Sequence, residues 1–286
     1  MKIYFYLVIC VILALVQCEN PFSSEDIYTP KNFFISQSWD GILLTWDDNN
    51  KYEDGYNIYR NNQKIMTLNP NINEYLDFSF SPFDPLSYFI SCFKDGETSK
   101  KTDIKNISIA IKFYDRFNNG IASYWYKVPQ TNLLTYSNGE MNINGDDYDG
   151  YQHNAYFYED VNTPFTFGAK MKKISGSNSE PFGIGVRSES TGARIFSFIS
   201  VDGKISIDEY SSDWRYLMSP ISIDYLNSSG YNEIRICVDN SELKVYINNH
   251  EVCLLNYLFS DLADCFYLYT QGDLSVNFDD IYLFEN

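Results

Sequence analysis

Stretches in which apolar and polar residues alternate recur along this 286-residue chain, and they constrain its fold most strongly. A period of two places successive side chains on opposite faces of a β-strand, whereas a helix would repeat its apolar residues every three or four positions. Aromatic residues make up 17% of the chain, with 25 Tyr and 21 Phe. Such rings suit half-buried pleated surfaces. We therefore expect an all-β protein.

The register of two strands near the C-terminus can be predicted from this alternation. The segments 234–238 and 243–247 each present three apolar residues on one face, and pairing them leaves Asp239 through Glu242 in a turn. After a second turn at Asn248-Asn249-His250, Val252 and Leu254 would extend the same apolar face. The opposite face would then carry four other side chains: Arg235, Cys237, Tyr246 and Cys253.

Cysteine pairing is constrained by the same register. Cys237 and Cys253 would lie two strands apart, about 10 Å by the usual strand spacing, which is too far for a disulfide. Either could instead meet Cys265 from the following strand. We expect Cys253–Cys265, although connectivity cannot be deduced from sequence alone.

Residues 1–18 have the pattern of a secretory signal peptide. Lys2 supplies a positive start, and an apolar run extends from Tyr4 through Val16. A run of about 13 residues is short for a bilayer span, so a cleaved signal is favoured over a retained membrane anchor. The mature protein is then expected to be secreted, without an integral membrane span. Asn106 and Asn227 begin Asn-x-Ser sequons and are candidate glycosylation sites in a eukaryotic pathway.

The formal net charge of −17 bears on possible partners. Such a chain would be repelled by nucleic acid and by an anionic membrane surface. Neutral glycans and divalent cations are compatible partners.

Residues 27–110 carry a series of motifs that resemble the fibronectin type III family. These are Leu44-Thr45-Trp46, Gly55 through Arg60, Tyr75-Leu76-Asp77, Pro85 and Tyr88 through Cys92. Asn61-Asn62 can adopt positive φ and predicts a hairpin turn. The resemblance implies a two-sheet sandwich in which Tyr88 is the corner tyrosine and Cys92 is a buried, unpaired thiol. It also implies a spacer or partner-binding role rather than catalysis.

Residues 111–286 resemble the concanavalin A-like lectin/glucanase superfamily, especially its laminin-G-like branches. The motifs are Phe113-x-Asp115-x-Phe117 with Trp125, Phe182 through Arg187, Glu242 through Asn248 and Val276 through Leu283. The resemblance implies a jelly roll, and thus an all-β chain made of a fibronectin type III-like sandwich followed by a concanavalin A-like jelly roll.

The carboxylates expected of a glucanase are missing from this sequence. A retaining enzyme needs two carboxyl groups about 5.5 Å apart, and members of the superfamily supply them from a Glu-x-Asp-x-Glu strand. The nearest segment here is Ser206-Ile207-Asp208-Glu209-Tyr210, with Ser in the nucleophile position. Asp208 and Glu209 are adjacent, so they should point to opposite faces. The sequence therefore favours a protein that is not an enzyme.

Two places could bind calcium. The loop Asp147-Tyr148-Asp149-Gly150 has alternating carboxylates, although it departs from an EF-hand. The resemblance also implies a site that joins Asp115 to Asp279 or Asp280 near the ends of the module.

Candidate sugar-binding residues are aromatic rings that stack on sugars and polar groups that bond to hydroxyls. Trp214, in a polar stretch, is the strongest candidate, followed by Arg187, Tyr148, Tyr151 and His153. We expect a secreted, non-catalytic protein that binds a glycan or a glycosylated surface through the jelly roll. The alternatives are an atypical glycoside hydrolase or polysaccharide lyase using Arg187, His153 and a tyrosine, and a protein-binding adhesion or structural module.

Overall fold

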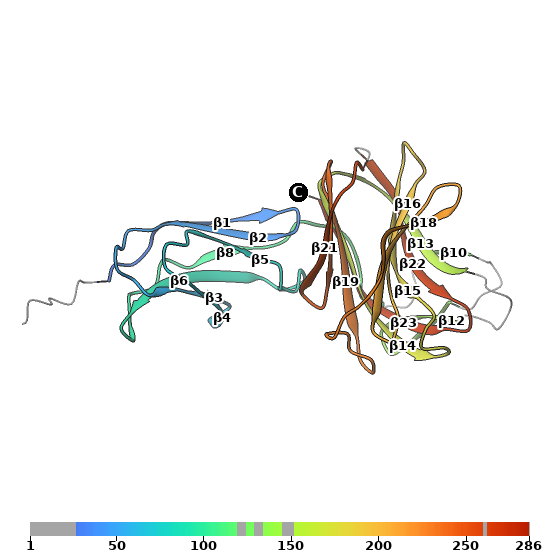
Figure 1. Ribbon diagram of the computed structural model, residues 1–286, viewed down its shortest axis with the longest axis horizontal. Helices are drawn as coiled ribbons and strands as arrows, with labels where there is room; N and C mark the ends of the chain where they lie inside the picture. The colour runs from blue at the N-terminus through green and yellow to red at the C-terminus, as the bar shows by residue number, and fades with distance from the viewer. Residues whose placement is uncertain (1–26, 119–123, 129–133, 145–151, 260–261, 286) are drawn as a thin grey trace, which may run out of the picture. The chain divides into compact units, whose positions relative to one another are not determined.

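The computed structural model describes residues 27–118, 124–128, 134–144, 152–259 and 262–285 (Figure 1). Every regular element in these ranges is a β-strand, which confirms the all-β prediction. No helix in the same ranges has the length and apolarity needed to cross a membrane. The predicted signal peptide, residues 1–18, lies outside the described residues.

The described chain divides into two compact units. One holds the described residues up to Ile35 together with Leu44–Tyr75 and Leu86–Asn106. The other holds Ser36–Leu43, Leu76–Pro85 and Ile107–Asn286. The expected module boundary between residues 110 and 111 stays a prediction.

The N-terminal strands form two antiparallel sheets. One sheet has the order β1-β2-β5, and the other has the order β4-β3-β6-β7 with β8 also paired to β6. Their bounds are β1 Lys31–Ser38, β2 Gly41–Asp47, β3 Gly55–Arg60, β4 Gln63–Leu68, β5 Glu74–Asp77, β6 Leu86–Lys94, β7 Glu97–Thr98 and β8 Lys105–Ile107.

The core of these N-terminal strands contains the predicted residues. Trp46 of one sheet lies 5.4 Å, between ring centroids, from Tyr56 of the other. Tyr88 is fully buried, and Cys92 is a buried free thiol, as expected. Asn61 and Asn62 both have positive φ, 49° and 65°. Two such residues define the tight hairpin turn that matches strand twist, so the predicted turn is confirmed.

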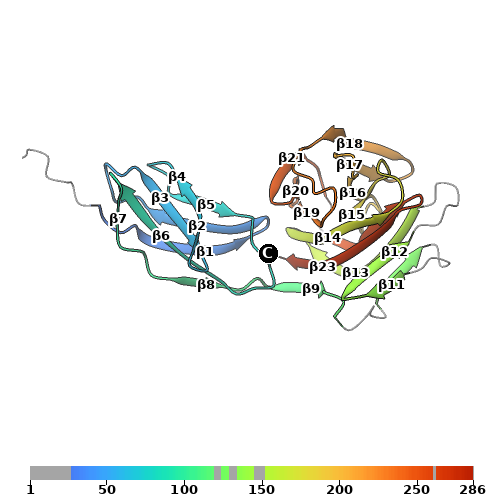
Figure 2. The same ribbon diagram turned by 90° about the horizontal axis from the view of Figure 1, so that it is seen from below.

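The second unit contains two larger antiparallel sheets, which face one another in Figures 1 and 2. The seven-stranded sheet has the order β10-β13-β22-β15-β16-β17-β18. Its strands are β10 Tyr126–Val128, β13 Gln152–Asn162, β15 Phe182–Ser188, β16 Arg194–Ile199, β17 Lys204–Tyr210, β18 Trp214–Ser222 and β22 Leu262–Gln271.

The eight-stranded sheet has the order β11-β12-β23-β14-β19-β20-β21, and β9 also pairs with β23. Its strands are β9 Ile111–Asp115, β11 Leu134–Ser137, β12 Glu140–Asn144, β14 Phe165–Ser175, β19 Asn232–Val238, β20 Glu242–Ile247, β21 His250–Asn256 and β23 Ser275–Glu285. Inward residues of both sheets form one core, in which Phe157 and Phe167 contact Phe266.

The predicted register of β19 and β20 is confirmed. Ile234 pairs with Ile247, and Ile236 pairs with Val245. The prediction for the next strand is confirmed at Val252, which packs against the core. It is wrong for Cys253 and Leu254, because a register shift between Val245 and Tyr246 puts Cys253 opposite Val245. Cys253 therefore packs against the core, while Leu254 is 50% exposed. A bulge adds one residue to a strand and thereby reverses its faces.

The expected Cys253–Cys265 disulfide is not formed, and both residues are free thiols. Cys253 lies on β21 of the eight-stranded sheet and contacts the core. Cys265 lies on β22 of the other sheet, in a separate cluster with Tyr267 and Tyr269. The prediction was wrong because it assumed that β21 and β22 are neighbours in one sheet.

Candidate functional site

The outer face of the seven-stranded sheet carries an unusual density of aromatic side chains. Phe182, Ile184 and Val186 of β15 point into the core, so Gly183, Gly185 and Arg187 lie on the outer face by alternation. Residues paired directly across neighbouring strands lie on the same face. The pairing registers therefore define rows of outer residues that cross the whole sheet.

Two such rows are central to the site. The arginine row crosses from β13 to β18 and consists of Tyr158, Cys265, Arg187, Arg194, Tyr210 and Trp214. The aspartate row starts one strand earlier, on β10, and consists of Tyr126, Tyr156, Tyr267, Gly185, Phe196, Asp208 and Tyr216.

Glycines in the central strand allow the aromatic rings to pack close to the backbone. A Cβ added to Gly185 would lie 2.3 Å from the Phe196 ring, and one added to Gly183 would lie 1.9 Å from the Ser197 carbonyl oxygen. Phe196 stacks on Phe198 with ring centroids 5.3 Å apart, and Phe198 lies 4.7 Å from Tyr269. These rings cover one another and form a buried floor.

Trp214 extends this floor to the edge of the sheet. Its ring centroid lies 5.3 Å from that of Phe196 and 5.2 Å from that of Tyr210, yet the side chain stays 39% exposed. A groove of about 790 Å³ opens beside it, and the residues that line it include Phe198, Ser206, Asp208, Tyr216 and Tyr269. An exposed indole at the edge of an aromatic groove can stack on a ligand.

Asp208 is a carboxyl group in this aromatic surrounding. Its cross-strand partners are Phe196 and Tyr216. Burial raises the pKa of Asp208 to about 6, and a hydrogen bond with Ser206 offsets only part of that effect. The Oδ1 atom is buried and has no hydrogen-bond partner.

The neighbouring Glu209 lies on the opposite face, as the sequence predicted. It accepts hydrogen bonds from Arg215 and from the hydroxyl of Tyr257, at 2.6 Å for the latter. The outer positions of β17 are therefore Lys204, Ser206, Asp208 and Tyr210. Across this strand, a single carboxyl group faces the groove.

The two strongest sequence candidates share the outer face. Arg187 and Trp214 belong to the arginine row and lie three strands apart, about 14 Å by the usual strand spacing. Arg187 is not free, because it donates two hydrogen bonds to Asp264, at 2.8 and 2.6 Å. These bonds raise the pKa of its guanidinium above the ordinary value.

The structure does not describe the side chains of the other three sugar-binding candidates. Tyr148 and Tyr151 lie outside the described residues, as does the acidic loop of the first calcium prediction. His153 belongs to β13, where its backbone pairs with Thr270 of β22. Its side chain is outside the described part.

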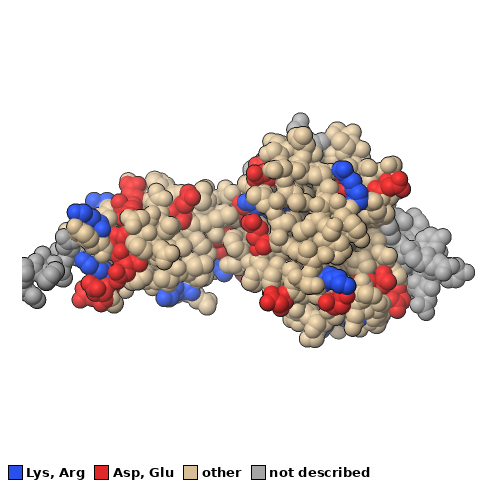
Figure 3. All heavy atoms as spheres, in the orientation of Figure 1, with Lys and Arg blue, Asp and Glu red and all other residues tan. Residues whose placement is uncertain are grey.

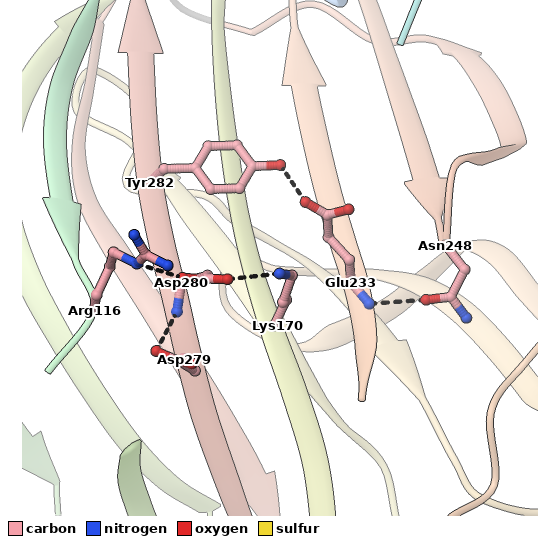
Figure 4. A network of polar contacts seen from close by, with 7 residues as sticks. All are labelled: Arg116, Lys170, Glu233, Asn248, Asp279, Asp280 and Tyr282. Atoms are coloured by element: carbon pink, nitrogen blue, oxygen red, sulfur yellow. Dashed lines mark hydrogen bonds and ion pairs between the residues drawn. The ribbon is translucent and has the colours of Figure 1, made fainter. Parts of the chain in front are cut away.

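The carboxylates of the second predicted calcium site have protein partners in the structure. Asp115 accepts hydrogen bonds from the Phe117 amide, the Tyr124 hydroxyl and the Trp125 indole. Asp280 lies between Arg116, at 3.0 Å, and Lys170, at 2.6 Å, and Asp279 accepts a bond from the Asp280 amide (Figure 4). No three acidic, histidine or cysteine side chains in the described ranges are grouped to hold a metal ion. Calcium binding by these carboxylates stays a prediction.

Both sequon asparagines are exposed, Asn106 on β8 and Asn227 after β18. Asn227 Oδ1 accepts a 2.8 Å hydrogen bond from the Gly230 amide. Glycosylation of either residue stays a prediction.

Sequence reasoning missed most of the aromatic floor. The sequence shows Phe-x-Phe at 196–198 and Tyr-x-Tyr at 267–269, which signals one aromatic face on each strand. That signal could not identify the outer face, because the core is also rich in Phe. The sequence around Asp208 shows only that the acid pair of a glucanase is absent, and it does not indicate an aromatic surrounding.

Comparisons with known proteins support the fold. No family model matches the sequence, and no curated protein matches it. An endo-β-1,3-glucanase from Pyrococcus furiosus is similar with a TM-score of 0.51 and 9% identity, over 67% of this chain and 96% of that chain. A GlcNAcα1-4Gal releasing endo-β-galactosidase from Clostridium perfringens gives 0.50 and 11%, over 63% and 64%. The carbohydrate-binding module CBM66 from Bacillus subtilis gives 0.46 and 10%, over 57% and 96%.

At these identities the likeness concerns the fold alone. The likeness to the first two structures supports a β-sandwich jelly roll in this chain.

Proposed function

We propose that this chain is a secreted, non-catalytic protein that binds carbohydrate, or a glycosylated surface, through the outer face of its seven-stranded sheet. The observation that carries the proposal is the groove in which the exposed indole of Trp214 adjoins Phe198, Tyr269 and the carboxyl of Asp208. Sugar sites combine a flat apolar ring for the pyranose face with a few polar groups that bond to its hydroxyls.

Two further points support recognition rather than hydrolysis. Double-displacement or inverting hydrolysis of a glycoside requires a pair of carboxyl groups, and the outer positions of β17 present Asp208 between Ser206 and Tyr210. Arg187, which an atypical enzyme could have used, is bound to Asp264. The names of the similar structures, a glucanase, a galactosidase and a carbohydrate-binding module, agree with a carbohydrate ligand, although their likeness to this chain is structural only.

We propose that the N-terminal sandwich is a fibronectin type III-like module that acts as a spacer or partner-binding unit. Its Leu-x-Trp and Gly-Tyr-x-Ile-Tyr-Arg motifs supply the buried Trp46, Tyr56 and Ile58, which is the structural use that such motifs have in that family. Secretion follows from the signal-like residues 1–18.

The test is binding of the mature protein to a panel of soluble β-glucans and galactans, followed by isothermal titration with the tightest ligand. Trp214→Ala should weaken binding about 30-fold, the effect of a residue worth about 2 kcal/mol at an interface. Tyr136→Ala is the matched control, because Tyr136 is 40% exposed but lies on β11 of the other sheet. A reducing-end assay should detect no product.

Failure of a folded sample to bind any polysaccharide would contradict the proposal. So would equal losses of affinity in the two variants, because the binding surface would then lie elsewhere. Release of reducing ends would show that the protein is a hydrolase and not a non-catalytic binding protein.

A further inference from the structure

The groove contains one carboxylate whose charge is not balanced by a cation. Three charged residues line it, Lys204, Asp208 and Arg215. The Lys204 ammonium lies 2.9 Å from Asp202, and the Arg215 guanidinium is bound to Glu209. For Asp208, the described residues supply no ion pair.

One oxygen of this carboxylate also lacks a hydrogen-bond donor. Its Oδ1 atom has no partner, and its cross-strand neighbours, Phe196 and Tyr216, place rings beside it. A buried acceptor without a donor destabilises a folded protein. Asp208 is therefore poorly explained as a structural residue, and because it lines the groove, a ligand bound there would bring hydroxyl donors beside this carboxylate.

We propose that the groove selects uncharged sugars, whose hydroxyl groups donate to Asp208 while a sugar ring stacks on Trp214, and that it excludes uronic, sialic and sulfated sugars. This inference rests on the proposed carbohydrate-binding function and adds the chemical class of the ligand. A hydroxyl donates to a carboxylate in a short, charge-assisted bond, whereas an anionic sugar would place a second negative charge beside Asp208.

The cations of the outer face do not reverse this preference. Arg187 is neutralised by Asp264. The Arg194 guanidinium lies over the rings of Tyr210 and Tyr267, 5.6 and 5.5 Å from their centroids, in the arginine row rather than in the groove lining. The net charge of the chain, −17, opposes anionic ligands further. Figure 3 shows no broad basic patch on the visible face of the second unit.

The experiment compares three soluble polysaccharides of different charge at pH 7 and 150 mM salt. They are a neutral β-glucan, polygalacturonate and glycol chitosan, a cationic chitosan derivative that stays soluble at this pH. Asp208→Asn keeps the size of the side chain but removes its charge and one acceptor. We expect the wild type to bind the neutral glucan at least tenfold more tightly than polygalacturonate, and Asp208→Asn to lose at least tenfold in affinity for the glucan.

Two control variants are measured together with Asp208→Asn. Glu97→Gln makes the same change of net charge on β7 of the N-terminal sandwich, where it should leave affinity unchanged. Arg194→Gln removes the cation of the arginine row and should leave neutral-glucan binding within twofold. A thermal unfolding curve confirms that each variant is folded.

The possible failures are distinguishable. If no polysaccharide binds, the proposed function itself is wrong. If Trp214→Ala abolishes glucan binding and Asp208→Asn does not, the function stands and this inference fails. Preferred binding of polygalacturonate, lost in Arg194→Gln, would likewise overturn the selection of uncharged sugars. So would salt-sensitive preferred binding of glycol chitosan.

Discussion

Asp208 and Glu209 are adjacent in the chain, yet their carboxyl groups lie on opposite faces of one sheet. Their pKa values are shifted in opposite directions. Asp208 faces the aromatic groove, and burial raises its pKa to about 6. Glu209 faces inward, where burial opposes its ionisation, but hydrogen bonds from Arg215 and Tyr257 outweigh burial and lower its pKa. Replacing each carboxyl group by its amide should therefore change the stability of the protein in opposite directions.

Asp208→Asn should stabilise the protein at pH 7. The pKa of Asp208 in the folded state, about 6, lies above its ordinary value of 3.8, so the folded state holds the proton more tightly than the unfolded state. The stability contributed by the protonated form is present below about pH 4 and is lost as pH rises through 6. We expect a gain of about 1–3 kcal/mol at pH 7, shrinking toward pH 4. Denaturant unfolding at both pH values measures it, and equal stability of variant and wild type at pH 7 would contradict the burial of this charge.

Glu209→Gln should have the opposite effect. The substitution keeps the size of the side chain but weakens the bonds from Arg215 and from Tyr257. A hydrogen bond to a charged group contributes about 1.5–3 kcal/mol, and exposure of Arg215 reduces its share. We expect a loss of about 1–2 kcal/mol at pH 7. The measurement is the same unfolding experiment, and a variant as stable as the wild type would show that this inner network is not formed.

Gly185→Ala should disturb the floor of the groove. The new Cβ would lie 2.3 Å from the Phe196 ring and 2.9 Å from the Ile195 carbonyl oxygen, so the ring must move. Crowding of this kind costs about 1–3 kcal/mol. The double variant Gly185→Ala with Phe196→Leu should recover part of the lost stability, because it shortens the side chain that clashes. If the double variant recovers no stability, the new Cβ clashes with the Ile195 carbonyl oxygen and not with the Phe196 ring.

The four cysteines in the described part of the chain should all be free. Cys92, Cys237, Cys253 and Cys265 are unpaired in the structure, and burial raises the pKa of the Cys265 thiol to about 11. All four should react with iodoacetamide in denaturant without prior reduction, whereas native labelling should be slow. The test is mass spectrometry of the alkylated protein. A peptide pair joined through Cys253 and Cys265 would require the two sheets to be arranged differently.

Local alternation was enough to predict several features of this protein. It identified strands, the faces of 234–238 and 243–247 and the opposite orientation of Asp208 and Glu209. The tolerance of Asn for positive φ predicted the Asn61-Asn62 turn. Each of these depends on residues close in the chain, because side-chain direction in a strand follows from the pleat alone.

Only the tertiary structure decided what those faces contact. The bulge beside Tyr246 reversed the faces of β21, and the assignment of β21 and β22 to different sheets separated Cys253 from Cys265. Trp214 and Arg187 were single candidates in the sequence, and strand order placed them in one row. The environment of Asp208 depends on Phe196, Tyr216 and Tyr269, which come from three other strands. Alternation says which side chains share a face, whereas burial, pKa and ligand access depend on pairings between distant segments, which no local pattern encodes.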